Sequence, residues 1–165
     1  MSLTVETGAI VPGAESYASV AEADAYWIVR NGTAWAALTT GAKEAALRMA
    51  TDYIEAVYGE RWLGDRVSAA QDLSWPRSGV YVDGVQIPSN ALPIALVRAT
   101  MELAVKASAG ELLADQGAQV TRETVGPITV EYAAGARQAT RYALVESLLA
   151  GLLTGGGGQI PVVRA

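Results

Sequence analysis

The stretch after Pro93 constrains the fold most, because its apolar residues form two stripes instead of one. Residues three and four apart share a face of an α-helix, and a helix with two apolar faces must be covered on both. The stripes consist of Ile94, Val97, Met101 and Ala104, and of Leu96, Leu103 and Ala107. Pro93 suits the first turn, where its missing N–H is not needed. The sequence therefore predicts a central helix that ends near Gly110, with one more helical turn over residues 111–114.

Three other segments carry helix signals. Ser19 and Glu22 have the spacing of a capping box, which predicts a helix from there to about Arg30, ended by Asn31 and Gly32. Residues 41–58 repeat apolar positions at three- and four-residue intervals, which indicates an amphipathic helix of about four turns. Residues 138–153 carry a broad apolar stripe and predict a last helix.

Two other regions favour β-structure. Residues 60–92 are rich in Gly and Pro, and Asp83-Gly84 lies between two short β-prone pieces, so we expect an ordered loop with a small hairpin, held to the core by Trp62, Leu73 and Trp75. In residues 120–132 the apolar period changes to two on both sides of Gly126-Pro127, which predicts a β-hairpin.

The fold class expected from these signals is mainly α: a compact bundle of about four helices with a protruding β-hairpin and an extended C-terminal tail. Residues 1–154 are predicted to form one helical domain that includes the loop 60–92 and the hairpin 120–132. Residues 155–165 are predicted to be a flexible glycine linker and a docking tail. The tail is apolar, which favours contact with a partner; its residues are Ile160, Pro161, Val162, Val163 and Arg164.

Composition narrows the function classes. The chain has no Cys and no His, so thiol nucleophiles are excluded and the commonest general base and metal ligand are missing. Twelve basic against seventeen acidic residues give a net charge of −5, and no two basic residues are adjacent, which disfavours a strong grip on phosphates. No apolar stretch approaches the roughly 20 residues that span a bilayer, so we expect a soluble protein made in the cytoplasm.

No motif specifies catalysis, and we expect no enzyme, cofactor or metal site. Trp75-Pro76-Arg77-Ser78-Gly79 could hold an unpaired base, but a Trp that anchors a turn is the favoured interpretation. The four glycines at residues 155–158 lack the Lys-Ser/Thr of a phosphate loop. The acidic pairs Glu22 with Asp24 and Asp52 with Glu55 fit helix faces better than acid–base chemistry. Arg137 and Arg141, four residues apart, are the best candidates for an anionic contact, although surface ion pairs are favoured.

The order of several short motifs resembles the head-tail connector, or neck adaptor, proteins of long-tailed phages. The motifs are Ser16-Tyr17-Ala18-Ser19, Tyr26-Trp27, Gln71-Asp72-Leu73-Ser74-Trp75-Pro76-Arg77-Ser78-Gly79, Ile87-Pro88, Leu92-Pro93 and Glu102-Leu103-Ala104. The hairpin around Gly126-Pro127 and the glycine-rich stretch before Arg164 also look like that family's hairpin and C-terminal arm. The resemblance covers roughly residues 15–164.

This resemblance implies a non-enzymatic subunit of a phage or prophage, monomeric in isolation and assembled into a ring of twelve under the portal protein. Other neck and tail proteins would be further partners, and DNA would cross the ring without specific binding. The subunit would be made in the bacterial cytoplasm and end in the virion neck. The implied protein-contact residues are Val125, Gly126, Pro127 and Ile128 of the hairpin, with Ile160 to Arg164 of the tail.

The chain also resembles DnaT-like proteins, which bind single-stranded DNA in replication primosomes. Under this alternative, the residues expected to contact nucleic acid are Trp62, Arg66, Trp75 and Arg77, which lie in one loop region. Aromatic rings would stack on bases while the guanidinium groups contact phosphates.

Overall fold

The computed structural model describes residues 2–114, 122–125, 128–131 and 140–155, with the backbone alone for 122–125 and 128–131. Its helices are α1 (Val20–Ile28), α2 (Thr33–Ala36), α3 (Thr40–Tyr58), α4 (Ile94–Ala107), α5 (Ala143–Leu149) and the 3-10 turn η1 (Ala150–Leu152). Its strands are β1 (Asp65–Arg66), β2 (Arg77–Ser78), β3 (Tyr81–Val82), β4 (Val85–Gln86), β5 (Arg122–Val125) and β6 (Ile128–Glu131). The prediction of a mainly helical chain with antiparallel hairpins is confirmed. None of the described helices is long and apolar enough to cross a membrane.

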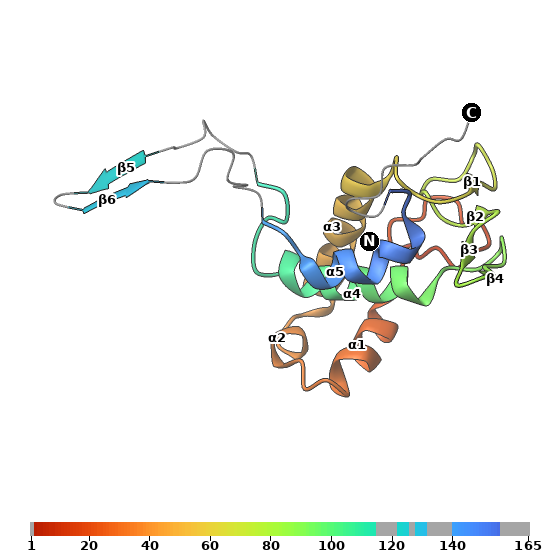
Figure 1. Ribbon diagram of the computed structural model, residues 1–165. Coiled ribbons are helices and arrows are strands. Elements are labelled where there is room, and N and C mark those ends of the chain that lie inside the picture. Colours follow the sequence, from red (N-terminus) through yellow and green to blue (C-terminus); the bar gives the residue numbers. More distant parts are fainter. Residues whose placement is uncertain (1, 115–121, 126–127, 132–139, 156–165) are drawn as a thin grey trace, which may run out of the picture.

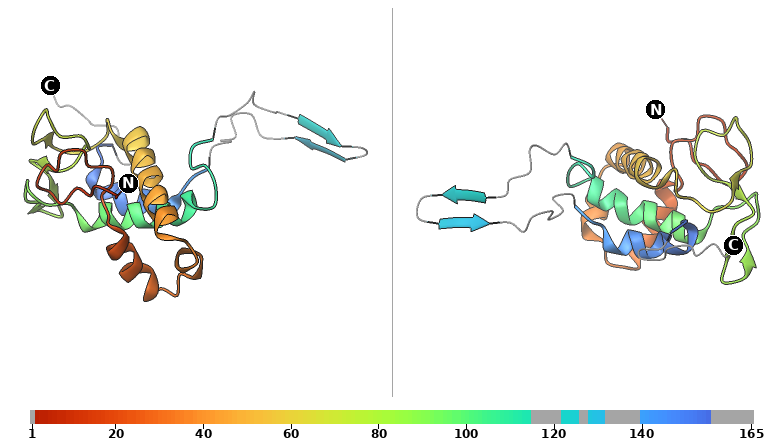
Figure 2. Two further views of the ribbon diagram at one scale, coloured as in Figure 1. Left: turned by 180° about the vertical axis from the view of Figure 1, so that it is seen from behind. Right: turned by 45° about the horizontal axis from the view of Figure 1, so that its top comes forward.

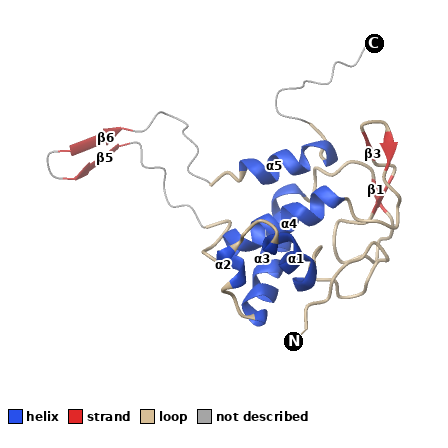
Figure 3. Ribbon diagram, turned by 90° about the horizontal axis from the view of Figure 1, so that it is seen from below, coloured by secondary structure: helices blue, strands red, loops and turns tan. Residues whose placement is uncertain are grey.

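Helix α4 lies between α3 and α5 (Figure 3). Residues of both predicted stripes are buried along it, among them Leu96, Met101, Leu103 and Ala107. The prediction of a central helix that starts after Pro93 is therefore confirmed. The extra helical turn predicted for residues 111–114 is wrong: that stretch is bent, and the side chain of Leu112 is buried in the core.

The caps of α1 and α3 explain where these helices begin. Ser19 accepts a hydrogen bond from the Glu22 backbone, and Glu22 Oε2 accepts one from the Ser19 N–H at 2.8 Å, which completes the predicted capping box. Asn31, with φ of 53°, lies just after the end of α1, as expected for a residue that tolerates the left-handed region. The hydroxyl of Thr39 accepts from the Ala42 N–H and caps α3.

The loop between α3 and α4 has structure of its own. Strands β1 and β2 pair antiparallel, and so do β3 and β4. Asp83 and Gly84 connect β3 to β4, and both have positive φ, 51° and 79°, as a two-residue hairpin turn requires. The prediction of an ordered loop with a hairpin at Asp83-Gly84 is confirmed.

The second predicted hairpin is present as β5 and β6. The pairing register joins Arg122 to Glu131 and Val125 to Ile128. In the three views of Figures 1 and 2, the hairpin stands apart from the helices, beyond the end of α4 at Ala107. Its turn, Gly126-Pro127, lies outside the described residues.

The end of the chain differs from expectation in one respect. Residues 140–142 are not helical, and α5 begins only at Ala143, so the helix predicted over residues 138–153 is shorter at its start. Residues 138 and 139 lie outside the described part of the chain. So does the predicted docking tail, residues 156–165, since the description ends at Gly155.

Candidate functional site

The α3–α4 loop holds the four residues predicted to contact single-stranded DNA, and it turns the two indole rings inward. Trp62 is 4% exposed and Trp75 0%. Their ring centroids lie 5.8 Å apart at an interplanar angle of 83°, an edge-to-face arrangement typical of aromatic cores. The prediction that Trp62, Leu73 and Trp75 hold the loop to the core is confirmed. A base could stack on these rings only after the loop opened, and their contact with DNA stays a prediction.

The two arginines of the loop bond to backbone carbonyls. Arg77 donates from Nε to the Leu63 oxygen at 2.8 Å and from Nη2 to the Gly64 oxygen at 2.5 Å. Arg66 donates from Nη2 to the Leu73 oxygen at 3.2 Å. Burial lowers the pKa of Arg77 from its ordinary value. Both guanidinium groups therefore brace the loop, which leaves fewer of their donors for a phosphate.

Glu55, one of the acidic residues considered for acid–base chemistry, holds the same loop to α3. Its Oε1 accepts the Tyr17 hydroxyl, and its Oε2 accepts the Ser74 N–H at 3.1 Å and the Ser74 hydroxyl at 2.6 Å. The Trp75 N–H donates to the Tyr17 oxygen at 3.2 Å. Burial raises the pKa of Tyr17 well above its usual value, and the charge of Glu55 raises it further. These contacts give Glu55 a structural role that the sequence did not reveal.

The other acidic candidates also have structural surroundings. Glu22 completes the α1 capping box, and Asp24 Oδ1 accepts from Trp35 Nε1 at 2.6 Å and from Lys43 Nζ at 2.8 Å. The hydrogen bond from Lys43 lowers the pKa of Asp24. Burial raises the pKa of Asp52, on α3. Within the described ranges, no three acidic side chains come together to hold a metal ion.

Of the two arginines proposed for an anionic contact, Arg141 donates from Nε to Glu146 Oε2, which matches the favoured interpretation of a surface ion pair. Arg137 lies outside the described residues.

The residues predicted to contact other proteins are described only in part. Val125 and Ile128 are directly paired at the turn end of the β5–β6 hairpin. Gly126, Pro127 and residues 160–164 lie outside the described part of the chain. The structure therefore confirms the hairpin itself and leaves its contacts as predictions.

A groove of about 740 Å³ lies between the N-terminal segment, α1 and the start of α4, and we call it the α1–α4 groove. Val29 and Ile94 line it and are 76% and 69% exposed.

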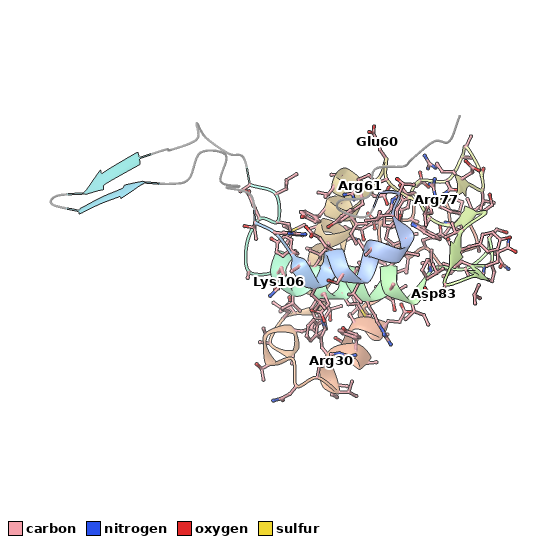
Figure 4. All side chains as sticks on the ribbon, viewed as in Figure 1. Arg30, Glu60, Arg61, Arg77, Asp83 and Lys106 are labelled. Carbon is pink, nitrogen blue, oxygen red and sulfur yellow. The ribbon has the colours of Figure 1, made fainter. Side chains whose placement is uncertain are left out.

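Tyr26 joins the two helices, because its hydroxyl donates to Glu102 Oε1 at 2.7 Å. Arg30 lies in the turn just after α1 (Figure 4), over the Tyr26 ring, with 3.6 Å between its Cζ and the ring centroid.

The N-terminal wall of the groove is fixed by Glu6, which the sequence did not single out. Glu6 is 2% exposed, and its Oε1 accepts the backbone N–H groups of Thr7, Gly8 and Ile10 at 2.7 to 3.0 Å. Its Oε2 accepts the Val11 N–H at 2.9 Å. One carboxylate thus accepts four backbone N–H groups of residues 7–11, which lie outside any helix or strand.

These features define a class: a small helical protein that carries a separate two-stranded arm, with several of its acidic residues and the loop residues Arg66 and Arg77 engaged in its own structure. The chain belongs to the family described as "Putative DnaT-like ssDNA binding protein", whose family model matches residues 1–165. No curated protein and no solved structure matches it. The resemblance to DnaT-like proteins is therefore confirmed at the level of the family, and the connector resemblance stays a prediction.

Proposed function

We propose that this protein is a non-enzymatic subunit of the ring that joins head to tail in a tailed phage or prophage. The observation that supports it most is the β5–β6 hairpin, which stands apart from the helices (Figures 1 and 2). An isolated two-stranded hairpin is only marginally stable in water. A hairpin in this position is therefore expected to gain its stability from another polypeptide, as it would in a ring of subunits.

The charge distribution supports the same proposal. The chain carries a net charge of −5, and several of its cations are engaged internally: Arg66 and Arg77 bond to the loop backbone, and Lys43 pairs with Asp24. A channel wall that does not grip phosphates lets DNA pass. We further propose that the portal and other neck proteins are the partners, that twelve subunits form the ring, and that the subunit leaves the bacterial cytoplasm in the virion neck.

The test is assembly on the cognate portal. Purified full-length protein mixed with the portal should give a ring-shaped complex visible by electron microscopy. Replacing the hairpin, residues 120–132, by a short Gly-Ser linker should reduce retention at least tenfold, while Val85→Ser, on the exposed β3–β4 hairpin, should leave it unchanged. Deleting residues 155–165 should also weaken it. A portal that never retains the full-length protein would exclude the connector role.

The description of the family favours a second candidate, binding of single-stranded DNA. It predicts salt-sensitive binding to labelled oligonucleotides. Because Trp62 and Trp75 are buried, binding at the predicted residues would also have to open the loop, and the loop would then become more susceptible to protease when DNA is added. Absence of oligonucleotide binding at low salt would exclude the single-stranded-DNA-binding function.

A further inference from the structure

The register of the β5–β6 hairpin separates its residues into an apolar and a polar face. Directly paired residues lie on the same face, and successive residues of a strand alternate between faces. The pairs Glu123 with Val130 and Val125 with Ile128 therefore share one face, and the pairs Arg122 with Glu131 and Thr124 with Thr129 share the other. The hairpin thus has an apolar face that bears one acid. None of the described helices lies against the hairpin in Figures 1 and 2.

The α1–α4 groove has the complementary chemistry. Its apolar lining includes Val29, Ile94 and Val97, and the first two are well exposed. Arg30 and Arg98 also line it, together with Glu6 and Glu22. The carboxylates of these two acids already accept hydrogen bonds, Glu6 from the backbone of its own segment and Glu22 from the Ser19 cap. The ion pairs found among the described residues use neither of these arginines. The groove therefore offers apolar contact to three aliphatic side chains and positive charge to one acid.

The positions of hairpin and groove favour contact between two copies of the chain. The groove lies at the Ile94 end of α4, while the hairpin extends beyond the other end, at Ala107 (Figure 1). A helix of 14 residues is about 21 Å long. A hairpin that points away from its own groove can enter the groove of a neighbour, and this head-to-tail contact closes into a ring when the rotation per subunit divides a full turn.

We propose that the apolar face of the β5–β6 hairpin, formed by Val125, Ile128 and Val130, docks in the α1–α4 groove of a second copy, where Glu123 faces Arg30 and Arg98. The inference rests on the proposed ring assembly and names the two surfaces that its subunit contact uses.

Disulfide trapping tests this contact directly, because the chain has no cysteine of its own. Full-length Ile128→Cys and Ile94→Cys proteins are mixed at about 1 mM, where a contact with a Kd near that value is populated, and are then oxidised. A disulfide-linked pair of one chain of each kind should form. Two control mixtures should give at least fivefold less of the linked pair. The first mixes Ile94→Cys with Thr129→Cys, on the polar face of the hairpin. The second mixes Ile128→Cys with Val67→Cys, an exposed apolar position outside the groove.

Charge reversal tests the polar part of the contact. Adding Arg98→Glu to the Ile94→Cys protein should lower the trapped yield about fivefold. Adding Glu123→Arg to the Ile128→Cys protein should restore much of that loss. Far-UV circular dichroism on each variant checks that the helices are kept, so that a low yield reports on the contact.

Two results would overturn the docking proposal: a trapped yield no higher than in the controls, or, in the double variant Ile94→Cys/Ile128→Cys, a disulfide that forms only within one chain. If the portal nevertheless retains the protein in a ring, the connector function stands and these surfaces are wrong. If trapping succeeds while the portal never retains the protein, the subunit contact stands and the connector function falls.

Discussion

The hydroxyl of Tyr17 donates a hydrogen bond to Glu55 Oε1, which fixes the segment before α1 to α3. The same carboxylate accepts the N–H and the hydroxyl of Ser74 through Oε2. Glu55 thus joins two segments that lie 38 and 19 residues away in the sequence. Because the loop that carries Ser74 also carries Trp75, this carboxylate helps to set the position of the aromatic core.

Replacing Glu55 by Ala should lower the free energy of unfolding by about 2–4 kcal/mol, because three donors lose an ionised acceptor. Urea denaturation followed by circular dichroism measures the change. The matched control is Glu60→Ala, an exposed acid just after α3 (Figure 4), which should change stability by less than about 0.5 kcal/mol. Equal losses in the two variants would show that the Glu55 contacts contribute nothing specific.

Stability should also fall in alkaline solution. The pKa of Tyr17 is raised well above its ordinary value of 10.0, and burial raises the pKa of Tyr58 to about 12. Above pH 10 the unfolded chain loses protons that the folded chain retains, so the free energy of unfolding decreases as the pH rises. Below pH 10 these two tyrosines contribute no pH dependence.

Denaturation at pH 8 and pH 11 measures this effect. The wild-type protein should lose more stability between the two values than Tyr17→Phe, which cannot ionise at that position. Tyr81→Phe, an exposed tyrosine on β3, is the matched control and should keep the full wild-type slope. An identical slope in the Tyr17→Phe variant would contradict the role assigned to Tyr17.

Features encoded by neighbouring residues could be predicted from the sequence. The Ser19–Glu22 capping box and the Asp83-Gly84 turn each depend on a few consecutive residues, and both are present. Helix α4 was predictable because its two apolar stripes lie within 14 residues. The turn expected at residues 111–114 failed because Leu112 is buried by contacts with distant parts of the chain, and these outweigh local helix propensity.

The candidate site was less predictable, because burial depends on contacts distant in the sequence. Trp62, Trp75, Arg66 and Arg77 have the composition of a stacking site, yet the fold places both rings in the core and both guanidinium groups on carbonyl oxygens. The α1–α4 groove brings together residues from three separate segments, and no local pattern marks it. Only the structure shows that Val29 and Ile94, both apolar, are exposed in it.

The role of Arg77 as a brace predicts that Lys cannot replace it. Its three nitrogen donors bond to the carbonyls of Leu63, Gly64 and Ser74, whereas a Lys ammonium is a single point donor that cannot span them. Arg77→Lys should cost about 1–3 kcal/mol of stability and make the loop more susceptible to protease. Arg61→Lys is the control: Arg61 lies at the start of the same loop and is exposed (Figure 4), so it should behave as wild type in both measurements.

Replacing glycine by alanine should have opposite effects on stability at Gly84, in the β3–β4 turn, and at Gly41, in α3. Gly84 has φ of 79° and open space around it, so an added Cβ meets no atom and Gly84→Ala changes only the backbone energy. That strain should lower stability by about 1 kcal/mol. Gly41, in the first turn of α3, also has open space and no positive φ, so Gly41→Ala should raise stability by about 0.5 kcal/mol. Urea denaturation of both variants decides the matter: a stabilising Gly84→Ala would mean that residues 83 and 84 do not form the two-residue turn that orients this hairpin.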